Sequence, residues 1–395
     1  MSEAPLLLKE PVVNRNRETV GYSMSLLSES GERAPVGGIS ALLARTAEFG
    51  SFFDRLPAHF VLADASQVES ERPLVGSGRY VLELLNTDGV EDISALARTW
   101  RGAGYGLCLD LTSGQEWPTE VIQQCAFARV DLQHGGDQLR GRLRGFSGKY
   151  IARGVSTNSS FDAAVRAGFD LCQGYFFTEP KGGHANAVGA TYSSIVALMK
   201  LAKEDAPIGR IEEVLKRDAA LSFRLLRYIN SAGFGLSCEI QSFRHAVTVL
   251  GYQNLHKWLA LLLVTAAKKN ASSALVTTAI ARGRLAELLG HDLFDAQDRD
   301  NLFITGAFSL LHVILQMPLE QITEQVTLGE AVNEALFQRT GPYGPLLELV
   351  ERLERLSQSE SVKRASDLAM SLNLTHDEVN RAQLEAQAWA EGLSR

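Results

Sequence analysis

The segment "GVSTNSSFDAAVRAGFDLCQGYFFTEP", residues 154–180, decides the fold. Its Ser and Thr residues stand just before "FDAAVRAGFD", where such residues typically cap the start of a helix. The apolar run "FDLCQGYFF" (169–177) that follows is typical of a β-strand, with a Gln-Gly-Tyr turn before Pro180. Another β-like run, "YIARGV" (150–155), leads into the segment. The sequence therefore predicts a strand, a capped helix and a closing strand in succession.

The same alternation extends back toward the N-terminus. Four more β-like runs precede the segment, at 60–65, 80–85, 106–111 and 127–133. A helix-like run with a terminal Gly lies at 92–104. Such alternation is typical of βα units and a mostly parallel sheet. The run "EPVVNRNRETVGYSMSLLS" (10–28) differs, because two β-like stretches flank "NRNRE" and so predict a hairpin.

A change of pattern after residue 180 predicts a domain boundary. The segment "PKGGHANAVGA" (180–190) is rich in Gly, Ala and Asn, and helix-like periodicity follows it to the end. The first apolar stripe contains Ile195, Leu198, Met199 and Ala202. The last helix is predicted to start at "THDE" (375–378), which has capping-box spacing. We expect an α/β domain over residues 1–185 and an all-α domain over residues 186–395.

The charge balance bears on possible partners. The chain has 395 residues and a formal net charge of −7, without a polybasic block. This balance argues against nonspecific binding to nucleic acid through phosphate neutralisation. Weakly spaced basic residues around a predicted helix at 218–232 are explained by an exposed, charged helix face. Nucleic acid is therefore not an expected partner.

Membrane insertion and secretion are not expected either. The longest apolar run, "WLALLLVTAA" (258–267), has ten residues, short of the roughly 20 needed to cross a bilayer. The N-terminal "MSEAPLLLKEPVV" carries an acidic residue where a signal peptide is basic. The four cysteines show no CxxC spacing, which fits a reduced compartment. We expect a cytoplasmic protein.

The order of segments in residues 5–180 resembles the EAL domain, a modified TIM barrel that hydrolyses cyclic di-GMP in bacteria. Residues 154–180 are similar to the closing part of that family. Earlier matches are "RETVGYSMSLL", "YVLELLN", "GYGLCLDL" and "FARVDL". The resemblance implies an incomplete or modified TIM-like EAL barrel.

From about residue 190 the chain resembles an HDOD domain, a helical relative of the HD and HD-GYP phosphohydrolases. The similarity is carried by residues 206–264 and by "DNLFITGAFSLLHVIL" (300–315), which stands where an HD enzyme carries its metal-binding His-Asp. His312 has no Asp after it. Two other His-Asp pairs, at 291–292 and 376–377, fall in a predicted C-cap and in the capping box, so no metal site is expected.

An EAL phosphodiesterase needs several carboxylates and an Asn at its strand ends, where they hold two divalent cations that activate water. By the resemblance, the family's ligand positions fall on Ser23, Ala63, Asn86, Leu111, Arg153 and Ser156, and its VKID lysine falls on Arg129. Arg153 argues most strongly against metal, because a guanidinium adds a permanent cation where a metal cluster needs anions. The resemblance thus implies a degenerate, non-enzymatic barrel without metal or cofactor.

Four polar residues persist where the family places functional groups: Glu83, Asp110, Asp131 and Gln173. They are residual ligand-binding candidates. The alternative is that polar groups persist at the mouth of a barrel after its activity is lost.

Three functions remain open. The first is a catalytically inactive bacterial signalling protein that acts through a partner protein in or near cyclic di-GMP signalling, since rim loops and helical grooves suit recognition. The second is a cyclic di-GMP sensor that binds without hydrolysis. The third is an active phosphodiesterase with a rearranged metal site, which has the least support because many ligands are changed at once.

Overall fold

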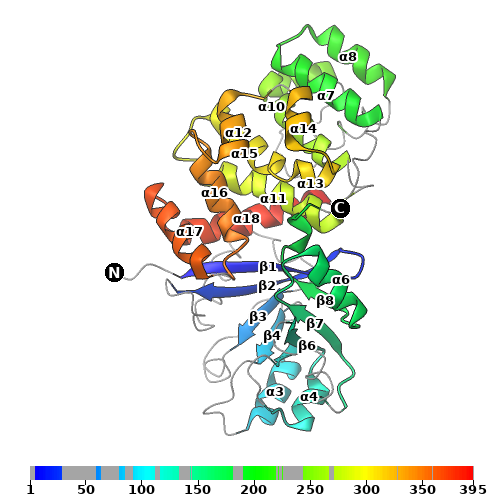
Figure 1. Ribbon diagram of the computed structural model, residues 1–395, viewed down its shortest axis with the longest axis vertical. Coiled ribbons are helices and arrows are strands. Elements are labelled where there is room, and N and C mark those ends of the chain that lie inside the picture. Colours follow the sequence, from blue (N-terminus) through cyan, green and yellow to red (C-terminus); the bar gives the residue numbers. More distant parts are fainter. Residues whose placement is uncertain are drawn as a thin grey trace. The chain divides into compact units, whose positions relative to one another are not determined.

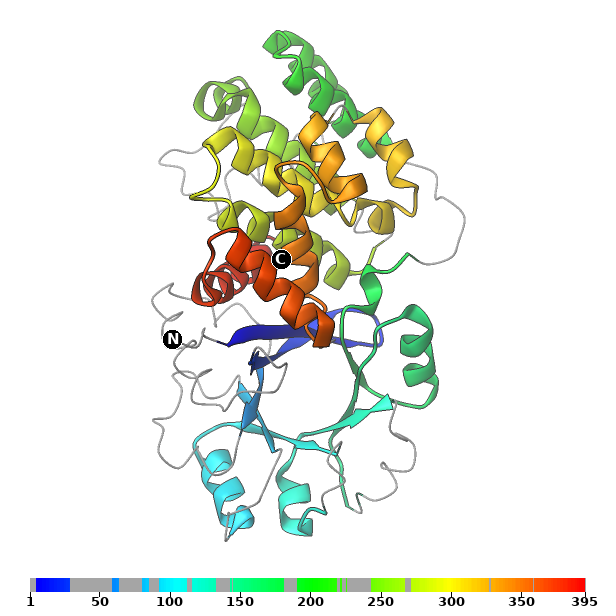
Figure 2. The ribbon, with the colours of Figure 1, turned by 60° about the vertical axis from the view of Figure 1, so that its left-hand side comes forward.

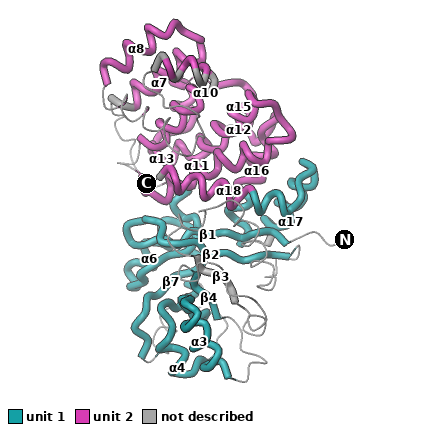
Figure 3. The backbone as a smooth tube through the Cα atoms, turned by 180° about the vertical axis from the view of Figure 1, so that it is seen from behind, with its two compact units in different colours: residues 1–179, 352–381 teal, residues 180–351, 382–395 magenta. Residues whose placement is uncertain are grey.

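The chain forms two compact units. The computed structural model (Figure 1) describes residues 5–28, 59–63, 80–84, 92–111, 116–132, 143, 145–180, 190–218, 221, 225, 243–266, 271–326, 328–357 and 359–394. By internal contacts, unit 1 contains residues 1–179 and 352–381, and unit 2 contains residues 180–351 and 382–395 (Figure 3). Unit 1 therefore includes a late stretch of the chain in addition to its first 179 residues. The division into domains at residues 185 and 186 stays a prediction.

Unit 1 contains a closed barrel of eight strands that follow one another in sequence order (Figures 1 and 2). The strands are β1 (Leu6–Asn14), β2 (Thr19–Leu27), β3 (His59–Ala63), β4 (Tyr80–Leu84), β5 (Gly106–Asp110), β6 (Phe127–Asp131), β7 (Lys149–Arg153) and β8 (Leu171–Gln173). β1 runs antiparallel to both β2 and β8, and all other neighbours are parallel. A TIM barrel has eight parallel strands. The barrel is therefore modified at its first strand, and its ring of strands is closed.

The predicted helices of unit 1 are present. The described helices are α3 (Ile93–Gly102), α4 (Thr119–Gln124), α6 (Asn158–Arg166), the short 3₁₀ helix η5 (Phe176–Thr178), α17 (Ser359–Ser371) and the first part of α18 (His376–Ser394). Asp92 caps α3, and Thr157 caps α6 through a reciprocal pair of bonds with Ser160. The closing strand is shorter than predicted, because the chain leaves β8 after Gln173 and turns into η5.

The Gln-Gly-Tyr turn closes the barrel by binding β8 to β1. The Gln173 side chain donates to Glu10 at 2.7 Å, the Gly174 amide donates to the Pro11 carbonyl at 3.0 Å, and the Tyr175 hydroxyl donates to a carbonyl on β1 at 2.9 Å. Gly174 has φ of +134°, and a Cβ there would lie 2.3 Å from the carbonyl oxygen of Val155. Only glycine fits both constraints.

The C-terminal stretch of unit 1 is held against the start of β1. Asn380, in the second turn of α18, is 2% exposed. Its Oδ1 accepts from the Leu7 amide at 2.7 Å, and its Nδ2 donates to the Pro5 carbonyl at 2.8 Å. These bonds join residues more than 370 positions apart, so no local sequence pattern announces them.

Unit 2 is helical, as predicted. Its helices are α7 (Ala190–Lys203), α8 (Ile208–Arg217), α10 (Phe243–Ala266), α11 (Ser273–Leu289), α12 (Ala296–Phe308), α13 (Leu311–Leu315), α14 (Leu319–Gln325), α15 (Glu330–Gln338), α16 (Gly344–Leu353) and the remainder of α18. The predicted α7 stripe is buried. α11 and α12 cross closely at Gly283 and Gly306, where a Cβ would meet backbone at 2.7 and 2.6 Å. Within the described ranges, no helix combines the length and apolarity that a bilayer crossing requires.

Candidate functional site

Strand register points one set of side chains into the barrel. Direct partners across neighbouring strands face the same side, and Glu83 pairs with Cys108 while Asp110 pairs with Arg129. An apolar cluster inside the barrel is formed by Val12, Val81, Cys108, Ile151 and Leu171. Toward the carboxyl ends of β4, β5 and β6, the inward positions are polar. The barrel interior therefore changes from an apolar layer to a charged one along the strands.

Arg129 occupies the centre of the charged layer. Its Nη2 lies 2.9 Å from Asp110 Oδ2 and 3.0 Å from Glu83 Oε2. Its Nη1 donates to Gln173 Oε1 at 3.4 Å and to Ser23 Oγ at 3.5 Å. Arg129 and Glu83 are fully buried, and the other three are at most 5% exposed. One guanidinium thus binds two carboxylates and two neutral polar groups.

The opposite charges in this layer stabilise the charged form of Arg129. Burial lowers the pKa of Arg129, but the adjacent Glu83 and Asp110 carboxylates outweigh burial and hold that pKa above its usual value. Arg129 is therefore a permanent cation. Burial, followed by the charge of Glu83, raises the pKa of the Cys108 thiol beneath, so this cysteine is a neutral thiol.

Arg153 and Asp131 lie one step further along the strands. They are register partners on β7 and β6, and both side chains are half-buried. Burial and then the charge of Arg129 lower the pKa of Arg153, while Asp110 and Glu10 oppose that effect. The prediction that Arg153 argues against a metal cluster stays a prediction. Arg129, which has two carboxylates within 3.0 Å, holds the central position.

The structure brings three of the four predicted site residues together. Glu83, Asp110 and Gln173 all contact Arg129, while Asp131 is the register partner of Arg153. Their role in ligand binding stays a prediction. Sequence reasoning missed the role of Arg129 and overlooked buried Glu10, which accepts from Gln173. The available signal was strand alternation, since both residues stand at inward-facing positions of predicted strands.

The structure also shows where most of the positions lie at which the resemblance implies a changed metal ligand. Ser23 lies on β2 within reach of Arg129, Leu111 is buried after β5, and Ser156 is exposed. Ala63 is the last residue of β3. Asn86 lies outside the described residues.

The charged layer does not fit the pair of divalent cations that an EAL phosphodiesterase holds. Such cations need several oxygen ligands free to converge on them. Glu83 and Asp110 instead converge on Arg129 Nη2. A divalent cation at the same place would meet a fixed positive charge about 3 Å away, where repulsion is strong in a buried setting.

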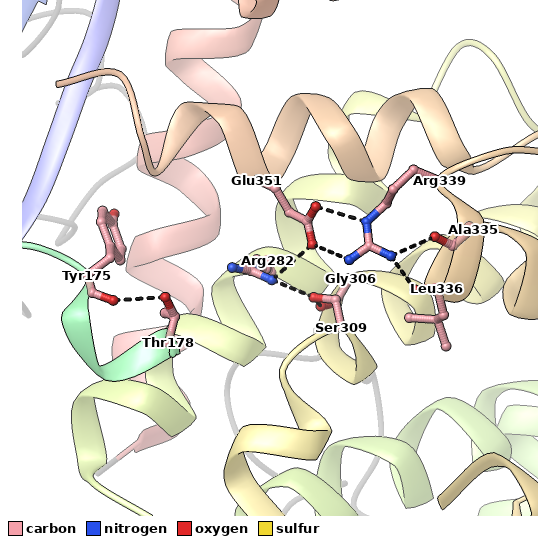
Figure 4. A network of polar contacts seen from close by, with 9 residues as sticks. All are labelled: Tyr175, Thr178, Arg282, Gly306, Ser309, Ala335, Leu336, Arg339 and Glu351. Carbon is pink, nitrogen blue, oxygen red and sulfur yellow. Dashed lines mark hydrogen bonds and ion pairs between the residues drawn. The ribbon is translucent and has the colours of Figure 1, made fainter. Parts of the chain in front are cut away.

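A second polar network lies inside unit 2 (Figure 4). Arg282 donates to Ser309 Oγ at 2.7 Å and lies 3.5 Å from Glu351. Arg339 binds the same carboxylate through two bonds of 2.9 Å and also donates to the carbonyls of Ala335 and Leu336. Two arginines therefore share one glutamate and join α11, α12, α15 and α16.

His312, which lies in the segment that resembles the metal-binding region of HD enzymes, is beside this network. Burial and then the charge of Arg282 lower its pKa, so the imidazole is neutral at pH 7. Val313 fills the position of the family's Asp and is buried. The other two His-Asp pairs lie where the sequence predicts. Gly290 is the C-cap of α11 before His291, and Thr375 and Glu378 form the capping box around His376.

Comparison with known proteins identifies the helical part. Residues 189–335 match the HDOD domain family. The chain contains an HDOD domain. The match extends from α7 into α15 and includes His312 and Arg282.

Two relatives extend beyond the HDOD domain. The chain is 29% identical over 324 residues to Cyclic di-GMP phosphodiesterase CdgJ of Vibrio cholerae, covering 80% of this chain and 74% of that protein. It is 31% identical over 249 residues to YuxH of Bacillus subtilis, covering 62% of this chain and 59% of that protein. A solved standalone EAL protein from Vibrio cholerae, with cyclic di-GMP bound, covers 45% of this chain and 92% of its own, at 16% identity and a TM-score of 0.33. Through its similarity to CdgJ, the chain is related to a protein of cyclic di-GMP signalling.

Proposed function

We propose that this chain is a catalytically inactive signalling protein that acts through a partner protein in or near cyclic di-GMP signalling. The HDOD domain and the similarity to CdgJ support the signalling context. One observation carries the proposed lack of hydrolysis: Arg129 Nη2 lies within 3.0 Å of both Glu83 and Asp110. Metal-assisted hydrolysis of a phosphodiester needs carboxylates that are available to cations. In this chain, the Arg129 guanidinium already binds both carboxylates.

The name of CdgJ describes it as a phosphodiesterase, and we propose that this chain differs in that respect. Ser23 supplies a hydroxyl where the EAL signature has a glutamate, and Arg129 fills the space between the remaining acids. Both changes act on the same group of inward-facing side chains. The first change removes ligand oxygens, and the second places a guanidinium against the acids that remain.

The direct test is an assay of hydrolysis with the full-length chain. The protein is incubated with cyclic di-GMP and either Mg²⁺ or Mn²⁺, and the nucleotides are separated by chromatography. We expect no linear product above a protein-free control, while a known cyclic di-GMP phosphodiesterase converts the substrate. Turnover that disappears in a Glu83→Ala variant would overturn the proposal.

The partner is tested separately. A tagged full-length chain is used to capture proteins from a lysate of the source cells, with a tagged unrelated helical protein as control. We expect a reproducible protein partner that the control does not retain. If repeated captures yield none, the adaptor role loses its support.

A second candidate is a cyclic di-GMP sensor that binds without hydrolysis. Arg129 neutralises much of the negative charge that would repel a dianionic ligand, and Arg153 lies nearby with no ion pair recorded among the described residues. Calorimetric titration with cyclic di-GMP, with and without Mg²⁺, distinguishes the two candidates. Saturable heat without turnover supports the sensor, and a flat titration rejects it.

A further inference from the structure

The last helix, α18, contributes residues to both units. By internal contacts, its residues up to Arg381 belong to unit 1, and its residues from Ala382 belong to unit 2 (Figure 3). Segments that connect domains are ordinarily exposed and rich in Pro, Gly and polar residues. Here the run "RAQLEAQAWAE" (381–391) contains neither Gly nor Pro and consists largely of strong helix formers. The chain therefore passes from unit 1 to unit 2 within a continuous helix.

The start of α18 is fixed within unit 1. The Thr375 amide donates to Glu378 at 2.8 Å, and the Glu378 amide donates to the Thr375 hydroxyl at 3.3 Å. In the next turn, the buried Asn380 accepts from the Leu7 amide at 2.7 Å and donates to the Pro5 carbonyl at 2.8 Å. Because Asn380 protects the Leu7 amide, hydrogen exchange at Leu7 reports the release of this end of the helix.

The second half of α18 is fixed within unit 2. Glu385 Oε1 lies 3.1 Å from Nη2 of Arg284 on α11. The Trp389 ring packs edge-to-face against Phe303 of α12, with the ring centroids 5.8 Å apart, and the Arg284 guanidinium lies 5.6 Å from the Trp389 centroid. Glu385 and Trp389 are four residues apart, so they lie on the same face of the helix. This face holds the second half of α18 to α11 and α12.

We propose that α18 is a coupling element that docks and releases as one cooperative unit, so that the state of α11 and α12 decides how firmly the start of β1 is held. A helix forms cooperatively, because each residue extends an existing ladder of hydrogen bonds. Loosening one end of α18 should therefore weaken the attachment of the other end, and by linkage the effect is reciprocal. A molecule that prefers one state of unit 2 would thereby change the barrel. This inference goes beyond the proposed function, since it holds whichever ligand or partner the chain binds.

The test is hydrogen–deuterium exchange at Leu7 in the full-length protein. The variant Trp389→Leu removes the ring contacts with Phe303 and Arg284, all of which lie in unit 2. We expect exchange at Leu7 to become about two- to tenfold faster, which corresponds to the loss of one aromatic pair. The matched control is Ile322→Val on α14, which destabilises a fully buried position of unit 2 by a similar amount. This control should leave exchange at Leu7 unchanged.

A second pair of variants tests whether the helix itself carries the effect. Arg381→Gly and Arg381→Ala remove the same exposed side chain at the division between the units, but only glycine weakens the helix there. In the Arg381→Gly background, Trp389→Leu should speed exchange at Leu7 less than it does in the Arg381→Ala background.

Three outcomes would overturn the inference. Unchanged exchange at Leu7 in a folded Trp389→Leu variant would show that the two ends of α18 release independently. An equal acceleration in Ile322→Val would mean that Leu7 reports general unfolding of unit 2. An equal response in the two Arg381 backgrounds would mean that the helix does not carry the effect. If Trp389→Leu does not fold, the more conservative Trp389→Phe is measured, and the same three criteria apply.

Discussion

Replacing Arg129 by Met should strongly destabilise unit 1 in the absence of divalent cations. The substitution leaves Glu83 and Asp110 inside the barrel without the guanidinium that lies within 3.0 Å of both. Breaking a buried ion pair by removing one partner costs about 3–5 kcal/mol, because the remaining charge is buried without compensation. For a unit of about 200 residues, this corresponds to a fall in melting temperature of about 6–20 °C.

The assay is equilibrium unfolding in urea at pH 7 with EDTA, followed by circular dichroism. Two controls are informative. Arg153→Met removes a half-buried arginine whose pKa is already lowered by burial and by Arg129, so we expect it to destabilise unit 1 less than Arg129→Met does. The triple variant Arg129→Met, Glu83→Gln and Asp110→Asn removes all three charges with little change of shape. It should recover most of the lost stability, because neutral replacement of a buried ionic group is often tolerated.

Two results would refute this reasoning. An Arg129→Met variant as stable as wild type would mean that the two carboxylates do not depend on the guanidinium. A triple variant as unstable as Arg129→Met would mean that packing of the arginine side chain, rather than its charge, is what the barrel loses.

Three further predictions concern the remainder of the chain. The pKa of His256 is lowered from 6.5 to about 4, chiefly by burial, so its contribution to stability is present above pH 6.5 and is lost as pH falls toward 4. In urea unfolding, His256→Gln should therefore remove up to about 3 kcal/mol of the loss between these pH values; an unchanged pH dependence would contradict this. Asn380→Ala removes one buried and one part-buried hydrogen bond at the start of β1, so it should cost about 1–3 kcal/mol and speed amide exchange at Leu7; unchanged exchange at Leu7 would contradict this. Gly174→Ala should cost at least about 2 kcal/mol because of its positive φ and the Val155 carbonyl 2.3 Å from the new Cβ; wild-type thermal stability in this variant would argue against the constraint.

Much of the architecture was predictable from local patterns. The strands around 80–85, 106–111 and 127–133 appear as β4, β5 and β6 within two residues of the predicted ends. Strand signals were clear because buried strands of a parallel barrel read as apolar runs between turn residues. The hairpin at "NRNRE" and the helical character of unit 2 were recognised for similar reasons.

The features of the fold and the site that the sequence does not predict depend on contacts between segments far apart in the chain. Residues 352–381 belong to unit 1 by their contacts, which helical periodicity alone cannot reveal. The central role of Arg129 arises because β4, β5 and β6 bring the carboxylates of Glu83 and Asp110 within 3.0 Å of its guanidinium. Strand register, rather than the identity of any single residue, decides which arginine reaches the acids. This explains why Arg153 drew attention in the sequence and Arg129 did not.

The persistence of a charged centre calls for a reason other than stability. Three buried charges carry desolvation penalties of several kcal/mol each, and an apolar layer would fill the same space at equal or lower cost. The triple neutral variant therefore also tests why the centre is kept. If that variant is as stable as wild type yet no longer binds its partner or cyclic di-GMP, the charged layer serves recognition of that partner or ligand. If it keeps both, the charged layer serves neither partner recognition nor cyclic di-GMP binding.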